Sequence, residues 1–210
     1  MSSVQQPFLE IVHYTVKDPD SFTAINERAA HALRPLTEGM GWWSHWRGED
    51  AAERAEVVAW SGPATAYAAA ETMERHPSMR FFMELLDEIK FMSHYHVENV
   101  PDWRALDQAG VLELALVDLG DAASAEPAHR DLHAALARRP GVRMNARLRR
   151  DKTTGGRGDL VLWKSAEAHA RAGEELPGLT ALQPYFSQIE TVHVFRTFRL
   201  ANFIPADANR

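Results

Sequence analysis

The chain has 210 residues, of which 45% are hydrophobic and 25% charged, and it carries a formal net charge of −6. This composition is typical of a folded globular protein, and the negative charge argues against nucleic acid as a partner. The absence of cysteine excludes disulfides, thiolate catalysis and zinc–sulfur sites. No apolar stretch approaches the roughly 18 residues of a membrane span. We therefore expect a cytoplasmic protein with neither a secretory signal nor membrane contact.

The first half of the chain recurs in the second half. The segment FLEIVHYTV, which begins at Phe8, aligns with VLELALVDL, which begins at Val111. The segment AEVVAWSG around Trp60 aligns with GDLVLWKS around Trp163, at the same offset of 103 residues. Ordered landmarks with a constant offset indicate a tandem repeat of one structural unit.

Each repeat is predicted to contain six elements in the order β-α-β-β-α-β. Runs of β-branched and aromatic residues predict the strands. They cover 8–16, 42–47, 56–60 and 91–97 in the first repeat, and 111–119, 142–149, 160–163 and 191–198 in the second. The first helix starts at Asp18-Pro19, where an N-cap precedes a proline. The second helix is broken by His76-Pro77 in the first repeat and by Pro177-Gly178 in the second.

The order of the elements predicts an α+β fold built from two ferredoxin-like repeats with antiparallel sheets. The helices of such a unit cover one face of its sheet. Apolar residues alternate onto both faces of the strand 8–16, so the second face also needs cover. We expect the two sheets to face each other within the chain as a barrel. The predicted divisions are repeat 1 over 1–100, a linker over 101–110, repeat 2 over 111–202 and a tail over 203–210.

Several short motifs support a family resemblance. They are the strand end Val16-Lys17-Asp18-Pro19, the strand ends Val58-Ala59-Trp60-Ser61 and Val161-Leu162-Trp163-Lys164-Ser165, and the break His76-Pro77. With these motifs the chain resembles the antibiotic-biosynthesis-monooxygenase-like (ABM) domains of the dimeric α/β-barrel superfamily. Members usually pair two chains into a barrel, so the resemblance implies that a tandem chain builds one internally.

The resemblance also implies an activity. It points to a cofactor-independent monooxygenase that acts on a small aromatic or polyketide-like substrate in an apolar pocket, without a metal. The haem-degrading branch is similar at Trp60 and Trp163, but it needs an asparagine on the first strand, which this chain lacks. Haem degradation is therefore disfavoured. The alternative is a non-catalytic protein that binds a small apolar ligand or assembles with itself, for example as a homodimer.

Candidate site residues are concentrated in the first repeat, which is richer in tryptophan, histidine and tyrosine on its strands. Histidines titrate near neutrality, and we predict His13, His94 and His96 as catalytic residues. Aromatic side chains can line an apolar pocket, and we predict Tyr14, Trp42, Trp46, Trp60 and Tyr95 as the substrate-binding residues. His94 and His96 share one face of a strand, but two histidines do not complete a metal site. The basic run from Arg138 to Arg157 fits either a solvated hairpin or a patch for an anionic ligand.

Overall fold

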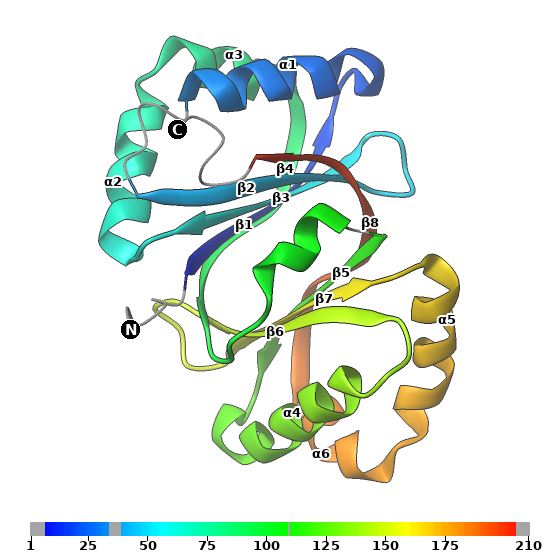
Figure 1. Ribbon diagram of the computed structural model, residues 1–210. Helices are drawn as coiled ribbons and strands as arrows, with labels where there is room; N and C mark the ends of the chain where they lie inside the picture. Colours follow the sequence, from blue (N-terminus) through cyan, green and yellow to red (C-terminus); the bar gives the residue numbers. More distant parts are fainter. Residues whose placement is uncertain (1–6, 34–38, 109, 205–210) are drawn as a thin grey trace. The chain divides into compact units, whose positions relative to one another are not determined.

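The structure is a computed structural model that describes residues 7–33, 39–108 and 110–204 (Figure 1). The chain divides into two compact units. The first comprises Met1–His96 together with Leu200–Arg210, and the second comprises Val97–Arg199. The end of the last strand therefore belongs to the first unit.

The first unit has a four-stranded antiparallel sheet in the order β2-β3-β1-β4. Three helices lie on one face of this sheet (Figure 1). The elements are β1 (Phe8–Val16), α1 (Pro19–Leu33), β2 (Met40–Arg47), β3 (Glu53–Trp60), α2 (Pro63–Glu74), α3 (Pro77–Leu85) and β4 (Leu86–Val97).

The second unit repeats this arrangement with the strand order β6-β7-β5-β8. A short 3-10 helix, η2 (Trp103–Gln108), precedes it. Its elements are β5 (Val111–Leu119), α4 (Ala122–Ala137), β6 (Val142–Arg150), β7 (Gly156–Trp163), α5 (Ala166–Glu175), η3 (Leu176–Gly178), η4 (Thr180–Leu182), α6 (Gln183–Phe186) and β8 (Ile189–Ile204).

The strand registers place equivalent residues at equivalent positions of the two sheets. Val12 of β1 pairs with Glu56 of β3, and Ala115 of β5 pairs with Asp159 of β7. The predicted α+β class, with two tandem ferredoxin-like repeats, is confirmed. Because the register repeats, a difference between two equivalent side chains can be interpreted as a difference in chemistry.

The helix-facing sides of the sheets carry the packed cores of the units. In the first unit Tyr14, Val16 and Phe22 pack with Leu86, and Phe82 lies against them. A second cluster contains Phe8, Trp43, Val58, Trp60, Ala66, Ala69 and Ile204. In the second unit Leu132 and Leu136 of α4 pack on the Trp163 side of its sheet. Burial of these apolar side chains supplies the main stabilisation of each unit.

Several strand boundaries differ from the predicted ones. β4 starts at Leu86 rather than at residue 91, because its pairing with β1 continues through Ile89 and Glu88 to Leu86, across two register shifts. β8 continues to Ile204, so the predicted tail starts within a strand, and residues 205–210 lie outside the described part. The first helix of the second unit, α4, starts at Ala122, and the Asp121 side chain caps it by accepting a bond from the Ser124 amide at 3.0 Å.

The predicted break of the second helix is present in the first unit. α2 ends at Glu74, and α3 starts at Pro77 after an N-cap at His76, whose Nδ1 accepts a bond from the Ser78 amide. In the second unit α5 gives way to η3 at Leu176. None of the helices in the described ranges is long and apolar enough to cross a membrane.

The basic run is more paired than a solvated hairpin would be. The Arg147 guanidinium donates to Glu126 at 2.7 Å and lies 3.5 Å from Glu98. The Arg150 guanidinium donates to Asp118 at 2.6 Å. Arg157 is buried, and it also lies near Glu126. Much of the positive charge of this run is therefore neutralised inside the second unit.

Candidate functional site

A cavity of about 310 Å³ lies inside the first unit. The helix-facing side of the sheet forms one wall, and α1, α2 and α3 form the other. Its lining residues are Glu10, Val12, Tyr14, Asn26, Ala29, Met40, Trp43, Glu56, Val58, Trp60, Ala70, Met73, Glu74, Met79, Arg80, Phe82, Met83, Leu86, Ile89, Met92 and Ile204. A largely apolar pocket with a few convergent polar groups is typical of a small-molecule site.

The apolar part of this lining is rich in methionine. Five of the seven methionines of the chain line the cavity, namely Met40, Met73, Met79, Met83 and Met92. Methionine is unbranched and polarisable, so it adapts to ligands of different outline and makes favourable contacts with aromatic rings. The helix side of the cavity is suited to a flat aromatic molecule.

Glu56 of β3 is the centre of the polar part of the lining. The Tyr14 hydroxyl donates to Glu56 Oε1 at 2.7 Å, and the Asn26 side-chain amide donates to the same oxygen at 3.0 Å. The Trp43 indole N–H donates to Oε2 at 3.2 Å. These donors come from β1, α1 and β2, so the packing of α1 on the sheet holds the carboxylate in one orientation.

The environment of Glu56 makes it a stronger base than an exposed carboxylate. Burial raises the pKa of Glu56, bonds from Tyr14, Trp43 and Asn26 lower it, and the nearby charge of Glu10 raises it, so that the pKa lies above its usual value. All three donors require Glu56 to act as an acceptor. Oε2 accepts only one of these three bonds, and a carboxylate oxygen has capacity for more than one. Glu56 can therefore accept a proton from a molecule in the cavity.

Tyr14 remains protonated beside this carboxylate. Burial raises the pKa of the Tyr14 phenol, and the charge of Glu56 and the hydrogen bond to it raise it further. At neutral pH Tyr14 is thus a hydrogen-bond donor and not a phenolate. The Tyr14 hydroxyl can therefore keep donating its hydrogen bond to the Glu56 carboxylate while that carboxylate acts as a base.

Glu10 is a second carboxylate in the wall of the cavity. Its Oε2 accepts a bond from the Trp60 indole N–H at 3.2 Å, and it lies 3.7 Å from His94 Nε2. The second unit has the same pair, in which the Trp163 indole N–H donates to Glu113 at 2.8 Å. The glutamate–tryptophan pair is therefore common to both repeats, whereas the cavity around Glu56 is described in the first.

Three of the predicted site residues lie at the cavity or next to it. Tyr14 and Trp60 line it. His94 is one step away, because its imidazole approaches Glu10 and its ring lies 5.0 Å from that of Tyr67. The structure thus brings Tyr14, Trp60 and His94 together around the two carboxylates.

The other five predicted site residues are not among those that line the cavity. His13 is buried, and its Nε2 lies 2.8 Å from Glu53 Oε1. The Trp46 indole N–H donates to Ser44 Oγ at 2.8 Å. The Trp42 ring lies 6.2 Å from that of Phe203, and the His96 ring lies 5.0 Å from that of Phe8. Tyr95 is buried.

Sequence reasoning missed Glu56 and Asn26, and it did not select Trp43. Glu56 is a charged residue next to an apolar run, four positions before Trp60. Because side chains alternate between the two faces of a strand, both lie on the same face. This spacing could have identified Glu56 from the sequence. His45 of β2 is a buried histidine of the first unit. In the structure burial lowers the pKa of His45 to about 3, with the charges of Arg54 and Arg47 as further causes, so that its imidazole is neutral at pH 7.

The residues that could hold a metal lie elsewhere. In the described ranges, one group of His, Asp and Glu side chains brings its ligand atoms within 4.8 Å of one another: His129, His133 and Asp159 of the second unit. The carboxylates of the cavity are instead bonded to indole, amide and hydroxyl donors.

Comparison with known proteins indicates the fold. No family model and no curated protein matches the sequence. An anthrone oxidase-like protein has a similar structure, with a TM-score of 0.77, 14% sequence identity and coverage of 100% of this chain and 98% of that one. A chlorite dismutase from Candidatus Nitrospira defluvii has a TM-score of 0.62 at 10% identity, covering 98% of this chain and 94% of that one.

A third similar structure bears on the ABM resemblance. It is a ferredoxin-fold protein related to antibiotic biosynthesis monooxygenases, from Listeria monocytogenes, with a TM-score of 0.53 at 12% identity and coverage of 95% of this chain and 98% of that one. Identities this low establish a shared fold and leave the chemistry to the site itself. The chain therefore shares the ferredoxin-like fold of these proteins, and its predicted resemblance to ABM-like domains is confirmed at the level of the fold.

Proposed function

We propose that this protein is a monooxygenase-like enzyme that deprotonates a small, uncharged aromatic molecule in the cavity of the first unit and lets the resulting anion react with oxygen. The observation that carries the proposal is the orientation of Glu56, a carboxylate of raised pKa held by Tyr14, Asn26 and Trp43 in the wall of an apolar cavity. A base with a pKa closer to the operating pH is more effective in proton transfer.

The lining of the cavity favours an aromatic substrate. Met73, Met79, Met83 and Phe82 offer polarisable and aromatic contacts on the helix side, and Trp43 and Trp60 offer flat rings on the sheet side. The charged side chains in the lining are Glu10, Glu56, Glu74 and Arg80. Three of these four are acidic, so a neutral substrate enters more readily than an anion. An anthrone, the compound class in the name of a similar structure, fits this description.

The reaction balances without another reductant. Glu56 removes a proton from the methylene carbon of an anthrone, and the carbanion, stabilised by the rings, transfers one electron to O2. Recombination of the two radicals forms a C–O bond and a peroxide. Loss of the second methylene proton and cleavage of the O–O bond then give the carbonyl of the anthraquinone. One oxygen atom stays in the product, and the other leaves as water with the two protons.

The test is oxygen uptake with anthrone and with a hydroquinone, with the quinone product followed by absorption. We expect turnover by the unaltered chain and a loss of about 100-fold or more in Glu56→Gln, since a positioned base contributes about 10²–10⁴-fold. Glu113→Gln removes an enclosed carboxylate from the second unit and is the matched control, with turnover close to that of the unaltered chain. Equal turnover in Glu56→Gln and the unaltered chain would refute the proposal.

The second candidate function is binding without turnover. The same cavity supports it, because an apolar pocket of about 310 Å³ can hold a small ligand whether or not Glu56 acts as a base. Quenching of the fluorescence of Trp43 and Trp60 by an aromatic ligand, with no oxygen consumed, would establish this function and exclude the first.

A further inference from the structure

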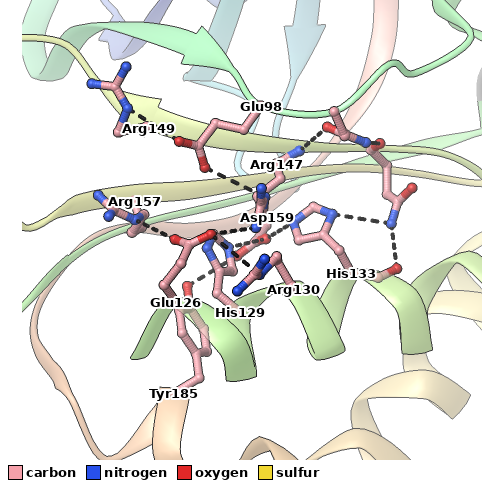
Figure 2. Close-up of polar contacts among 12 residues, drawn as sticks. Glu98, Glu126, His129, Arg130, His133, Arg147, Arg149, Arg157, Asp159 and Tyr185 are labelled. Carbon is pink, nitrogen blue, oxygen red and sulfur yellow. Dashed lines mark hydrogen bonds and ion pairs between the residues drawn. The ribbon is translucent and has the colours of Figure 1, made fainter. Parts of the chain in front are cut away.

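The second unit contains a buried group of side chains that the proposed function does not use. His129 and His133 of α4 and Asp159 of β7 are 0%, 8% and 4% exposed. Figure 2 shows the two imidazoles pointing at the Asp159 carboxylate, with Tyr185 of α6 beside His129. Three elements of the unit thus direct polar groups to one point in its interior.

The ligand atoms of this group converge closely. His129 Nε2 lies 2.9 Å from Asp159 Oδ1, and His133 Nε2 contacts the same oxygen. The histidines are four positions apart on one helix, a spacing that places both on one helix face. Asp159 Oδ2 accepts a bond from the Tyr185 hydroxyl at 3.2 Å, and the Tyr185 ring stacks on that of His129 at 4.7 Å.

At the equivalent position of the first unit, the carboxylate is bonded to donors that do not ligate a metal. Glu56 occupies the position of Asp159, and Asn26 occupies that of His129 on the equivalent helix. An amide N–H only donates to the carboxylate, whereas a neutral imidazole nitrogen can bind a cation. The second repeat therefore has two potential nitrogen ligands beside its carboxylate, which the first repeat lacks.

We propose that His129, His133 and Asp159 form a binding site for a divalent transition-metal ion, with Zn²⁺ as the best match. Two imidazoles and one carboxylate are a ligand set that Zn²⁺ adopts with three protein ligands, and first-row neighbours such as Co²⁺ accept it too. Tyr185 lies against the carboxylate and orients it. The ring stack of Tyr185 on His129 holds the first imidazole in the ligating orientation.

The surrounding positive charges are arranged around a separate carboxylate, that of Glu126 on α4. Glu126 accepts a bond from Arg147 at 2.7 Å, and it lies near Arg130 and Arg157 (Figure 2). These arginines are thus matched by a carboxylate of their own. The polar partners of Asp159 in this group are instead the two histidines and the Tyr185 hydroxyl.

Metal binding requires a defined proton change. In the structure the Asn145 side-chain N–H donates to the His133 carbonyl at 2.9 Å and faces His133 Nδ1 at 3.2 Å. His133 Nδ1 is then an acceptor and Nε2 carries the proton that faces Asp159. An ion needs Nε2 free, so the proton must move to Nδ1, and the Asn145 amide must turn its oxygen toward Nδ1.

The experiment uses the full chain after treatment with a chelator. Zn²⁺ is titrated by calorimetry, and Co²⁺ is titrated by visible absorption, in which intense d–d bands report a site of low coordination number. We expect one ion per chain. His133→Gln and Asp159→Asn should each weaken this binding by more than about 100-fold, and Tyr185→Phe by about 10-fold, as is usual for an outer-shell partner. Circular dichroism and thermal unfolding of each variant show whether it folds.

Two controls separate this site from other histidines. His169→Gln removes a half-buried histidine of the same unit and should leave the affinity for Zn²⁺ unchanged. Tyr185→Phe keeps all three ligands, so it remains informative if a ligand variant fails to fold. Two results would overturn the proposal: no binding of Zn²⁺ or Co²⁺ by the unaltered chain, or binding that persists unchanged in both His133→Gln and Asp159→Asn.

Discussion

The two repeats place a carboxylate at the same position of the same sheet and surround it differently. In the first repeat Glu56 is held by amide, indole and hydroxyl donors in the wall of a cavity, and its pKa is raised. In the second, burial alone would raise the pKa of Asp159, but the charges and hydrogen bonds of His129 and His133 outweigh it, so that this pKa lies below its usual value. The partners of a buried carboxylate decide which of its forms the fold favours.

This difference separates the roles of the two repeats. A carboxylate of raised pKa next to an apolar cavity is suited to accept a proton. A carboxylate of lowered pKa between two imidazoles is committed to its charged form, and it is suited to hold a cation or to fix the histidines. Under the two proposals, one fold would support two kinds of chemistry in one chain.

The largest difference between the two repeats is expected when Asp159 and Glu56 are each replaced by the corresponding neutral amide. Asp159→Asn should lower the free energy of unfolding by about 3–5 kcal/mol, the cost of removing one partner from a buried charged cluster. Glu56→Gln should cost about 1–2 kcal/mol, because the fold already disfavours the charged form of Glu56 and a glutamine oxygen still accepts hydrogen bonds. Urea unfolding of both variants at pH 7 measures the difference. Equal costs would contradict the assigned roles.

Glu113, the second carboxylate of the second repeat, predicts a change of stability with pH. Burial raises the pKa of Glu113 to about 7, although the hydrogen bond from Trp163 lowers it. The nearby charge of Asp159 raises it further. Because the pKa of Glu113 is raised in the folded state, this carboxyl contributes stability in full below pH 4.5, the ordinary pKa of a glutamate. That contribution is lost as the pH rises through about 7. The loss is on the order of 3 kcal/mol. Glu113→Gln should remove this slope, as followed by urea unfolding from the ordinary pKa of a glutamate to mildly alkaline pH.

Removal of the Tyr14 hydroxyl should shift the pH profile of turnover. The hydrogen bond from Tyr14 lowers the pKa of Glu56, so Tyr14→Phe lets that pKa rise further. The base must be ionised, and the acid limb of kcat/KM therefore moves to higher pH, with a stability cost of about 1 kcal/mol. Tyr185→Phe removes a hydroxyl donor to Asp159 in the second unit and serves as the control. An acid limb that moves in Tyr185→Phe as well would show that Glu56 is not the group that titrates.

The smallest effect is expected from the methionines. Met79→Leu preserves the volume and the apolar character of the cavity wall, and such a swap costs less than about 1.5 kcal/mol. We expect turnover within roughly threefold of the unaltered chain, because an adaptable wall can adjust to one change. A large loss of ligand affinity, measured by tryptophan quenching, would show that this wall is selective rather than adaptable.

The sequence predicted the repeat, the order of the elements and two of the residues that line the cavity. The constant offset between Trp60 and Trp163 was sufficient for the fold, and Tyr14 and Trp60 were placed among the substrate-binding residues. It could not indicate which face of each strand the helices cover, because the strands carry apolar residues on both faces. That is why Trp42 and Trp46 were preferred to Trp43.

The partners of Glu56 were beyond sequence reasoning for a related reason. Asn26 is 30 residues away from Glu56 along the chain, on a helix whose rotation about its own axis is fixed only by packing. A single asparagine at a helical position has no periodic signal. The pair His129 and His133 did have one, since histidines four positions apart on a predicted helix share a face, and that spacing was available in the printed sequence.

The most direct test of the central claim is a crystal structure of the protein with a bound hydroxyanthraquinone, which resembles the proposed product and is not turned over. The claim predicts the rings between the sheet of the first unit and α1 and α3, with a hydroxyl group within hydrogen-bonding distance of the Glu56 carboxylate. A ligand bound in the second unit beside Asp159, or in the first unit away from Glu56, would contradict it.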